Sequence, residues 1–501
     1  MYTYTYQSIA IQTDGKIIAV GYLPSTTSTT DYENFGVLRL NTNGAIDTTY
    51  GTNGFVNSVL FSETGGSNMI KIQSDDKIIV TGNYTSSTGA STTNTDFSTA
   101  RYNINGTLDT TFGVNGYAIT DFGSINGETS RTVEIQNDGK ILVAGSAHYP
   151  NYDLAIVRYL SNSLLDTSFA TNGKFTYNFG TTTIPFSNGL SSDEVSAIKI
   201  NSLGKIILGA TTNVNESSNN NSNFGFICLN SNGTLDTSFG NNGQKVVDFG
   251  GASYLDNLKI TTDDKIIATG EHDYTVGTNQ LTNIPLVKLL ANGNFDTSFG
   301  NNGIVLTNRD ATNTFDIVHD LSIQADGKII CFGATPNSTN TSADFLLIRF
   351  NIDGTIDSTF NTIGYKTVSF NSSSAVGYSF LIQNDGKIVC SGAINLTSSA
   401  SGVGCLARLE IDNLSTNSFE KNKFYISPNP FSDSITISTK DINLSLVTIE
   451  LYDISGRKIS NFTTENTNNF NFSINSNLSK GNYFLKITDQ QTTQTFKLIK
   501  E

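Results

Sequence analysis

Residues 132–145 read TVEIQNDGKILVAG, and this short stretch contains the features that decide the fold. Its first half alternates apolar and polar residues, a period of two that is typical of a strand with one packed face. An Asp-Gly turn follows, which is a strong signal for a tight β-hairpin because such turns need positive φ angles. The second half is almost wholly apolar, so we expect a strand that neighbouring sheets cover on both faces. The stretch recurs seven times, centred on Lys16, Lys77, Lys140, Lys205, Lys265, Lys328 and Lys387.

Each hairpin is followed by a polar loop, a third strand and a fourth strand. The third strand reads FSTARYN at residues 97–103, and the fourth reads GYAITDF at residues 116–122. Four strands per unit, seven units and almost no helical periodicity predict an all-β fold, a seven-bladed β-propeller with four-stranded blades. The third strand carries a recurring basic residue, which we expect to form a structural ion pair: Arg39, Arg101, Arg158, Lys288, Arg349 and Arg408, with Cys228 as the exception.

The turn before the fourth strand has the most specific sequence of the repeat, N-x-[ND]-G-x-[IL]-D-x-[ST]-[FY] in its fullest copies. Asp can accept backbone N–H bonds there, and the aromatic residue can fill the gap between blades. An alternative makes the turn a calcium loop, because its oxygen ligands resemble the start of an EF-hand loop, although the closing bidentate acid is missing. We expect a blade connector and no cofactor other than this possible calcium. The aspartates are Asp47, Asp109, Asp166, Asp236, Asp296 and Asp357.

The repeat ends near residue 410, and the last eighty residues have a different pattern. They contain FYISPNPFSDSITIS, IELYDISGRKI, LSKGNYFLKI and FKLIK, which are alternating strands ended by Ser-Gly and Lys-Gly turns. This pattern predicts a small β-sandwich. We therefore expect a propeller of seven repeats in residues 1–410, a linker in residues 411–423 and a C-terminal sandwich in residues 424–501.

The repeat resembles a known family. The unit FSTARYNINGTLDTTFGVNGYAITDFG followed by TVEIQNDGKILVAG closely resembles the bacterial delta-60 repeat, and the resemblance covers about residues 7–410. It implies a propeller-like surface module, and the family has no established catalytic residues to carry over.

The tail is similar to the type A C-terminal sorting domain of the type IX secretion system of Bacteroidota. The resemblance rests on Pro428, Asn429 and Pro430, on the turn Gly456-Arg457, and on Lys480, Gly481 and Tyr483. It implies passage through the outer membrane by the type IX machinery, removal of the tail by a sortase and frequent attachment to lipopolysaccharide. The expected location is therefore secreted or on the outer-membrane surface.

The N-terminus does not fit this export route. Residues 1–12 show no basic n-region and no apolar h-region, so no signal peptide is visible. The fourth-strand sequence that should precede Gln7 is also missing, so we expect an incomplete first blade and a missing N-terminal segment. The way in which the propeller ring closes has an alternative, because residues 414–426 align loosely with the turn and fourth strand of the repeat. Residues 424–426 would then pair into the first blade instead of the tail.

Composition excludes several functions. The 501 residues carry a net charge of −14, which disfavours nucleic acid as a partner. No stretch approaches the roughly 20 apolar residues of a transmembrane helix. The four cysteines and three histidines are scattered without a CxxC motif, so we expect no metal site built from them.

The best candidate for a pocket is the cluster Asp316, His319 and Asp320 in FDIVHDLSIQ. An Asp-His pair can serve as a general base, but a solvated or hydrogen-bonded surface pair is the more common case. Acids near the same strand start, Glu128, Glu194 and Asp256, make Asp316 part of a repeated pattern that either surrounds a cation or caps turns.

The loops between the second and third strands are rich in Ser, Thr and Asn, in residues 22–34, 83–95, 211–223 and 335–343. A propeller presents such loops on one face, where binding functions commonly lie. We expect a binding module for a polysaccharide or a surface protein, and no enzyme, because no catalytic constellation is evident. The alternatives are a polysaccharide hydrolase or lyase with carboxylates at the channel mouth, and a structural adhesion or surface-layer component.

Overall fold

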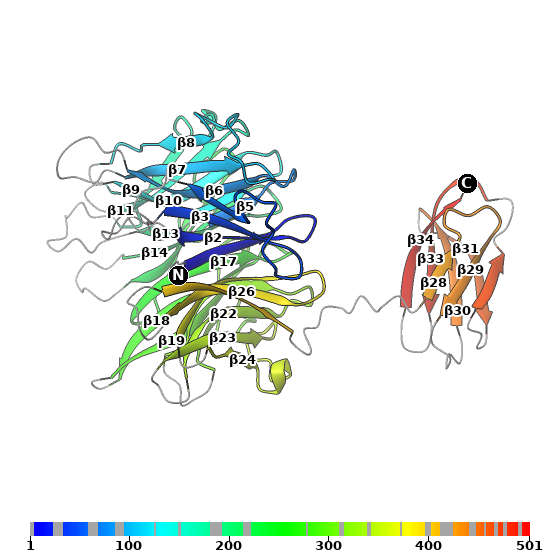
Figure 1. The fold of residues 1–501 in the computed structure, drawn as a ribbon. Helices are drawn as coiled ribbons and strands as arrows, with labels where there is room; N and C mark the ends of the chain where they lie inside the picture. The colour runs from blue at the N-terminus through cyan, green and yellow to red at the C-terminus, as the bar shows by residue number, and fades with distance from the viewer. Residues whose placement is uncertain are drawn as a thin grey trace. The chain divides into compact units, whose positions relative to one another are not determined.

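The computed structural model divides the chain into two compact units, Met1–Leu414 and Ser415–Glu501, both drawn in Figure 1. Among the described residues, none forms a helix with the length and apolar character that a membrane crossing requires. The described residues are 5–23, 34–58, 69–85, 95–124, 127–148, 152–180, 193–213, 222–276, 279–309, 315–337, 342–370, 373–395, 402–410, 424–439, 447–454, 457–464, 469–473, 478–488 and 493–500.

The first unit consists of antiparallel sheets whose strands follow one another in chain order, as the sequence predicts for propeller blades. Blades 1 to 3 are β1 (Thr5–Ile11), β2 (Ile17–Leu23), β3 (Asn34–Leu40), β4 (Phe55–Ser58); β5 (Met69–Ile72), β6 (Ile78–Thr85), β7 (Thr95–Tyr102), β8 (Tyr117–Thr120); and β9 (Glu128–Ile135), β10 (Ile141–His148), β11 (Tyr152–Tyr159), β12 (Lys174–Tyr177). Blades 4 and 5 are β13 (Glu194–Ile200), β14 (Ile206–Thr212), β15 (Asn223–Leu229), β16 (Gln244–Val247); and β17 (Ala252–Ile260), β18 (Ile266–Val276), β19 (Asn279–Leu289), β20 (Ile304–Thr307).

Blade 6 is β21 (Ile317–Ile323), β22 (Ile329–Pro336), β23 (Ala343–Phe350) and β24 (Tyr365–Val368), with the short 3₁₀ helix η1 (Phe360–Thr362) in its last turn. Blade 7 is β25 (Ser374–Ile382), β26 (Ile388–Asn395) and β27 (Gly402–Leu409). The all-β propeller fold is thereby confirmed.

The expectation of an incomplete first blade is not what the structure shows. Blade 1 has four strands, and blade 7 is the blade with three among the described residues. The reason is that the fourth strand of each four-stranded blade pairs with the third strand just before it in the chain, as β4 does with β3. The fourth strand of blade 1 is therefore β4, and not a strand that precedes Gln7.

The first strands of successive blades contact one another and form the inner wall of the propeller. The ring closes where β25 of blade 7 contacts β1 of blade 1. Val389 packs there with Ile9 and Ile17 in one apolar cluster, and Nη1 of Arg408 donates to the backbone carbonyl of Thr42 at 2.8 Å.

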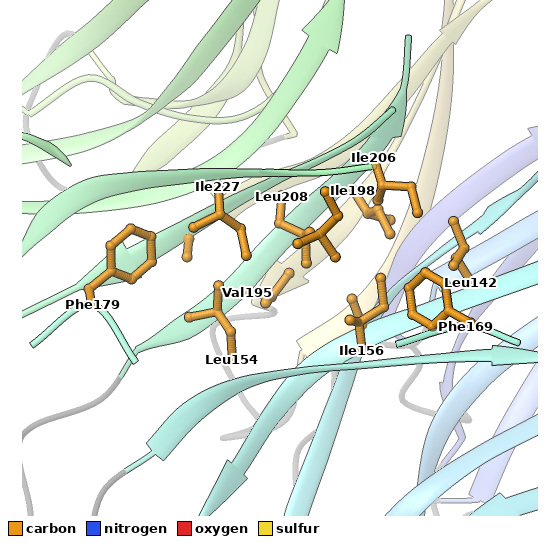
Figure 2. Close-up of a cluster of buried hydrophobic side chains, with 13 residues drawn as sticks. Leu142, Leu154, Ile156, Phe169, Phe179, Val195, Ile198, Ile206, Leu208 and Ile227 are labelled. Carbon is orange, nitrogen blue, oxygen red and sulfur yellow. The ribbon is translucent and has the colours of Figure 1, made fainter. Parts of the chain in front are cut away.

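The hydrophobic core lies between the blades. Figure 2 shows one such cluster, in which Leu142 and Ile156 of blade 3 face Val195 and Leu208 of blade 4. The second strands are buried on both faces because each is covered by the blades before and after it, as their uninterrupted apolar sequence predicts. Burial of this apolar surface is the main favourable contribution to folding.

The connecting turn is held by its aspartate. In blade 2, Nε of Arg101 donates to Oδ2 of Asp109 at 2.7 Å, and the guanidinium lies 4.8 Å from the centroid of the buried Phe112 ring. Nη1 of Arg101 donates to the carbonyl of Ser161 in the next blade at 2.7 Å. Gly116 has φ = 95°, and a Cβ there would lie 2.4 Å from Leu108. The turn thus connects neighbouring blades.

The second unit holds two antiparallel sheets around one apolar core. Phe424 pairs with Thr439 in this unit and is fully buried in its core, which excludes the alternative pairing into blade 1. The reason is that Phe424 packs in one apolar core with Ile435, Ile437 and Ile449 of the same unit. The sheets are β28 (Phe424–Ser427), β29 (Ser434–Thr439), β32 (Asn469–Ser473); and β31 (Lys458–Thr464), β30 (Val447–Asp453), β33 (Gly481–Thr488), β34 (Thr493–Lys500).

Candidate functional site

A cavity of about 570 Å³ lies in the centre of the propeller, and we call it the channel. Residues from the first strands of all seven blades line it, from β1, β5, β9, β13, β17, β21 and β25. Its volume is within the roughly 300–1,000 Å³ that is common for small-molecule sites.

Local irregularities in the first strands place six side chains on the channel wall. In each of six blades the register between the first and second strands skips one residue, which is a β-bulge. The skipped residues all line the channel, and we call them the bulge ring: Gln7, Arg131, Ser196, Asp256, His319 and Tyr378.

Glycine in the second strand leaves room for the bulge. A Cβ atom at Gly270 would lie 1.9 Å from the carbonyl oxygen of Tyr254, and one at Gly333 would lie 2.1 Å from that of Ile317. These glycines end the apolar runs KIIATG and KIICFG. The run therefore provides both a buried strand and the backbone space that directs Asp256 and His319 to the channel.

The bulge ring differs in every blade, whereas the packed positions two residues later do not change in character. Those positions are all apolar in the seven blades: Ile9, Ile70, Val133, Ile198, Leu258, Leu321 and Phe380. The residue type thus repeats from blade to blade where the blades pack, and it varies from blade to blade where side chains line the channel. This is the arrangement expected of a specific site on a regular scaffold.

Nearer the hairpins, four charged side chains form what we call the lysine ring: Lys71, Glu134, Lys199 and Lys259. Nζ of Lys71 lies 3.0 Å from Oε1 of Glu134, and Nζ of Lys199 lies 2.7 Å from Oε2 of the same carboxylate. Nζ of Lys259 lies 3.5 Å from Oδ1 of Asp320. Three ammonium groups therefore share two carboxylates.

The charges of the lysine ring shift one another's pKa. Burial, together with the charge of Lys199, lowers the pKa of Lys71 to about 8. Burial would raise the pKa of Glu134, but Lys199 and Lys71 outweigh it and lower this pKa to about 2. Burial also lowers the pKa of Lys259, although Asp320 opposes this. The ring is thus a partly desolvated, net positive layer of the channel.

On the side of the bulge ring, Asp256, Glu271 and His319 converge. One ligand atom from each lies within 4.8 Å of the others, and Nδ1 of His319 is 3.5 Å from Oδ2 of Asp256. Burial, with the charge of Asp256, raises the pKa of Glu271 to about 7. Burial would lower the pKa of His319, but Asp256 outweighs it and raises this pKa. Two carboxylates and one imidazole at this separation could hold a divalent metal.

The structure separates the residues of the predicted pocket. His319 and Asp320 line the channel, and the ring of His319 lies 5.7 Å from that of Tyr378. The carboxylate of Asp320 accepts hydrogen bonds from Nδ2 of Asn257 at 2.8 Å and from the backbone N–H of Phe380 at 3.1 Å. Asp316 is fully buried elsewhere, where the backbone N–H of Arg309 donates to it at 2.6 Å.

The acids near the strand starts also fall into two groups. Glu128 is buried like Asp316 and accepts the backbone N–H of Phe122 at 2.7 Å. Glu194 instead accepts from Nη2 of Arg131 at 2.6 Å, and Asp256 belongs to the bulge ring. The structure therefore aligns Asp256 with His319, and not with Asp316 as the sequence pattern suggests.

The carboxylates of the turn aspartates are paired with cationic side chains of the protein. Oδ2 of Asp109 is within 2.8 Å of Nζ of Lys77 as well as bonded to Arg101, and Oδ1 accepts from Thr111 at 2.6 Å. Two cationic side chains already neutralise this carboxylate, as they do at Asp47, Asp166, Asp296 and Asp357. At Asp236, Lys205 provides one cation and Cys228 lies 3.7 Å away.

Most of the polar loops predicted as a binding surface, in residues 24–33, 86–94, 214–221 and 338–341, lie outside the described residues. The sequence did not lead us to predict the lysine ring, which includes Glu134, nor Arg131 and Glu271. One signal could have found the lysine ring, since these residues occupy the single polar position between the two apolar residues of the first strand, as in MIKI and TVEI.

The tail residues have mainly structural contacts. Nδ2 of Asn429 donates to the carbonyl of Lys497 at 2.9 Å, and its Oδ1 accepts the N–H of Ile499 at 2.9 Å, so this loop is joined to β34. The peptide bonds before Pro428 and Pro430 are cis. Nε of Arg457 is 3.0 Å from Asp453, whereas Gly456 lies outside the described residues. Gly481 begins β33 directly after Lys480, and the hydroxyl of Tyr483 donates to the carbonyl of Ser479 at 2.7 Å.

Comparison with solved structures finds likenesses at low sequence identity. One is PorZ, described as an essential bacterial surface component of the type IX secretion system of Porphyromonas gingivalis, at 12% identity and a TM-score of 0.40; the match covers 99% of this chain but only 59% of PorZ. Another is a polysaccharide lyase of family PL25, an ulvan lyase, at 10% identity and a TM-score of 0.47, covering 81% of this chain and 94% of the lyase. No curated protein matches the chain. At these values no binding or catalytic property transfers.

The family comparisons are specific. Residues 425–501 match the family described as a secretion system C-terminal sorting domain. Six segments match the family described as a domain of unknown function (DUF5122) beta-propeller, at residues 12–50, 73–112, 136–169, 204–239, 261–299 and 324–360. The chain is therefore a β-propeller protein built from DUF5122 repeats, and its C-terminal sorting domain makes it a secreted or cell-surface cargo of the type IX secretion system.

Proposed function

We propose that this secreted propeller is a binding module that holds an extracellular polysaccharide bearing carboxylate or sulfate groups in its central channel. The observation that carries the proposal is the contrast between the apolar packed positions, which repeat, and the bulge ring, which has a different side chain in each blade. Packing alone needs no such variety, whereas recognition of an asymmetric ligand does.

The charges of the channel favour an acidic ligand. The whole chain is acidic, at a net charge of −14, so the long-range electrostatic field of the protein would repel a polyanion. At contact distance the local charges dominate, because exposed charges beyond about 8–10 Å are largely screened at physiological salt. Lys71, Lys199 and Lys259 share two carboxylates, and an anionic group of the ligand would supply the missing negative charge.

Among the enzymatic alternatives, the geometry disfavours an inverting hydrolase. One oxygen of Asp256 and one of Glu271 lie within 4.8 Å of each other, so the two carboxyl groups are too close for the roughly 6.5–9.5 Å separation of an inverting glycosidase. A lyase keeps one supporting observation, because Glu271, with a pKa near 7, is suited to accept a proton at neutral pH. The cavity itself argues against a purely structural coat protein, for which flat faces suffice.

The sorting domain adds a second part to the proposal. We infer that the type IX machinery delivers the chain, that its sortase removes the tail, and that the propeller can then be attached to lipopolysaccharide. The support for this part is the match of residues 425–501 to the sorting family.

The proposal is tested by screening the full chain against an array of acidic and neutral polysaccharides at low and high salt, with product analysis of every bound polymer. We expect binding to acidic polymers that weakens with salt and leaves the polymer intact. Cleaved product with a new unsaturated end would establish the lyase instead. Binding only to proteins, or an empty array at both salt concentrations, would contradict the proposal.

A further inference from the structure

Three carboxylates meet at the junction of blades 2 and 3, away from the channel-lining residues. Asp96 lies in β7, Asp121 follows β8, and Glu128 begins β9. One oxygen from each lies within 4.8 Å of the other two. Asp96 and Glu128 are buried, at 8% and 1% exposure, whereas Asp121 is exposed and leaves the cluster open to solvent.

Two oxygens of this cluster are buried without a hydrogen-bond partner among the described residues. They are Oδ1 of Asp96 and Oε2 of Glu128. The other oxygen of Glu128 is satisfied, because it accepts the backbone N–H groups of Phe122 at 2.7 Å and Ser124 at 3.3 Å. Leaving a buried carboxylate oxygen unpaired costs about 1–3 kcal/mol or more.

The nearest cationic side chain is engaged elsewhere. Nζ of Lys174 donates to the backbone carbonyl of Asp121 and lies 5.4 Å from the centroid of the Phe122 ring. Its charge lowers the pKa of Asp96, but burial and the charge of Asp121 outweigh it and raise this pKa. Burial likewise raises the pKa of Glu128 to about 7, against the two backbone hydrogen bonds. Among the described residues, no cationic side chain forms an ion pair with a carboxylate of this cluster.

The corresponding positions of the next blade junction show what compensation looks like. There the set is Asp153, Asn178 and Asp193, and Nδ2 of Asn178 donates to Oδ1 of Asp153 at 2.5 Å. The hydroxyl of Thr212 donates to Oδ1 of Asp193 at 2.5 Å. An amide and a hydroxyl thus satisfy the two acids in this copy.

The equivalent positions at a third blade junction have the same two donors, an amide and a hydroxyl. Nδ2 of Asn308 donates to Oδ1 of Asn283 at 2.8 Å, and the hydroxyl of Thr335 donates to Oδ1 of Asp316 at 2.5 Å. In the Asp96 copy both donors are lost, because the amide is replaced by Asp121 and the threonine by Ala147, which pairs with Glu128. The replacements remove two donors and add a third carboxylate at the same place.

We propose that Asp96, Asp121 and Glu128 bind a calcium ion that replaces the two missing donors. Three carboxylates without histidine or cysteine are hard oxygen ligands of the kind that calcium prefers, and the exposed Asp121 leaves room for water to complete the coordination shell. The ion would join blades 2 and 3 through residues of three strands or strand ends. This site is independent of the channel, so it can fail while the proposed function holds, and the reverse.

The test is calorimetric titration of calcium chloride into the full chain after removal of metals with EDTA, together with melting temperatures with and without calcium. The wild type should bind calcium and melt at a higher temperature with it. Asp121→Asn, which restores the amide of the neighbouring copy, should lose this site or weaken it by at least about tenfold, without loss of stability in EDTA. Asn178→Asp should gain one equivalent, because it creates a third carboxylate beside Asp153 and Asp193.

The matched control is Asp138→Asn, which removes a carboxylate from the solvent-exposed hairpin of blade 3 and should leave both the stoichiometry and the calcium-induced rise in melting temperature unchanged. An Asp121→Asn variant that binds as much calcium as the wild type would overturn the proposal. A wild-type chain that neither binds calcium nor melts at a higher temperature with it would also overturn the proposal. In that case a proton shared between Asp96 and Glu128 compensates the negative charge of the cluster. Equal binding of magnesium would overturn the assignment to calcium.

Discussion

Nε of Arg349 donates a hydrogen bond to Oδ2 of Asp357 at 2.7 Å, and both side chains are almost completely buried. The same bond joins Arg39 to Asp47, Arg101 to Asp109 and Arg158 to Asp166, each time across eight residues. The guanidinium of Arg349 also lies 4.8 Å from the centroid of the Phe360 ring. The pair therefore fixes the turn against the third strand and holds the aromatic residue that fills the space between blades.

Removing one partner of this pair should be strongly destabilising. We expect Asp357→Asn to lower the free energy of unfolding by about 3–5 kcal/mol, because it leaves the buried guanidinium without its anion. Chemical denaturation measures the effect. The matched control is Asp385→Asn, which breaks the solvent-exposed ion pair of Asp385 with Lys387 and should have little effect. Equal losses for the two variants would contradict a structural role of the buried pair.

The turn aspartates also predict how stability depends on pH. Hydrogen bonds from Thr49, opposed by burial and assisted by the charge of Arg39, lower the pKa of Asp47 from 3.8 to about 2. Bonds from Lys328 and Thr359 and the charge of Arg349 outweigh burial and lower the pKa of Asp357 as well. A lowered folded-state pKa stabilises the fold above pH 3.8, and this contribution is lost as the pH falls toward 2. Melting temperature against pH should therefore drop in this window, and less steeply in Asp47→Asn.

The lysine ring predicts opposite effects of two neutralising substitutions. Glu134→Gln removes the anion shared by Lys71 and Lys199, so it should strengthen binding of an acidic polysaccharide by about tenfold at low salt. Lys199→Gln should weaken it by a similar factor. Calorimetric titration with the polymer found by the array measures both, and a change in the same direction for both variants would exclude charge recognition in this layer.

Delivery depends on the tail. Deleting residues 424–501 from the full-length gene should leave the propeller in the periplasm, because the sorting domain is the part that the type IX machinery handles. Cell fractionation followed by immunoblotting measures this, with an unaltered chain as the control. Unchanged surface display of the shortened chain would refute a sorting role for the tail.

The sequence determines the fold well because packed positions repeat. Ile9 and Ile70 occupy equivalent core positions, and the alternation around them defines each first strand. The site was less predictable. Asp316 and His319 stand three apart, which places them on opposite faces of a regular strand, and the bulge at His319 has no periodic signature of its own.

The partners of His319 come from another blade, so their proximity is a property of the ring and not of any local motif. Asp256 lies in β17 and Glu271 in β18, both in blade 5. Only the closed propeller brings them within reach of β21. The same holds for Glu134 of blade 3, which meets lysines of blades 2 and 4.

The most direct test of the central claim, that the channel is the ligand site, is a binding measurement with the channel filled. Ser196 belongs to the bulge ring and has a small, uncharged side chain, so the larger side chain of Ser196→Trp should fill the channel without breaking an ion pair. The matched control, Leu203→Trp, changes a residue of the same blade that is 74% exposed in the hairpin. We predict that Ser196→Trp abolishes polysaccharide binding while Leu203→Trp binds as the wild type does, with both variants melting near the wild-type temperature. Undiminished binding by a folded Ser196→Trp variant would place the ligand elsewhere and contradict the account.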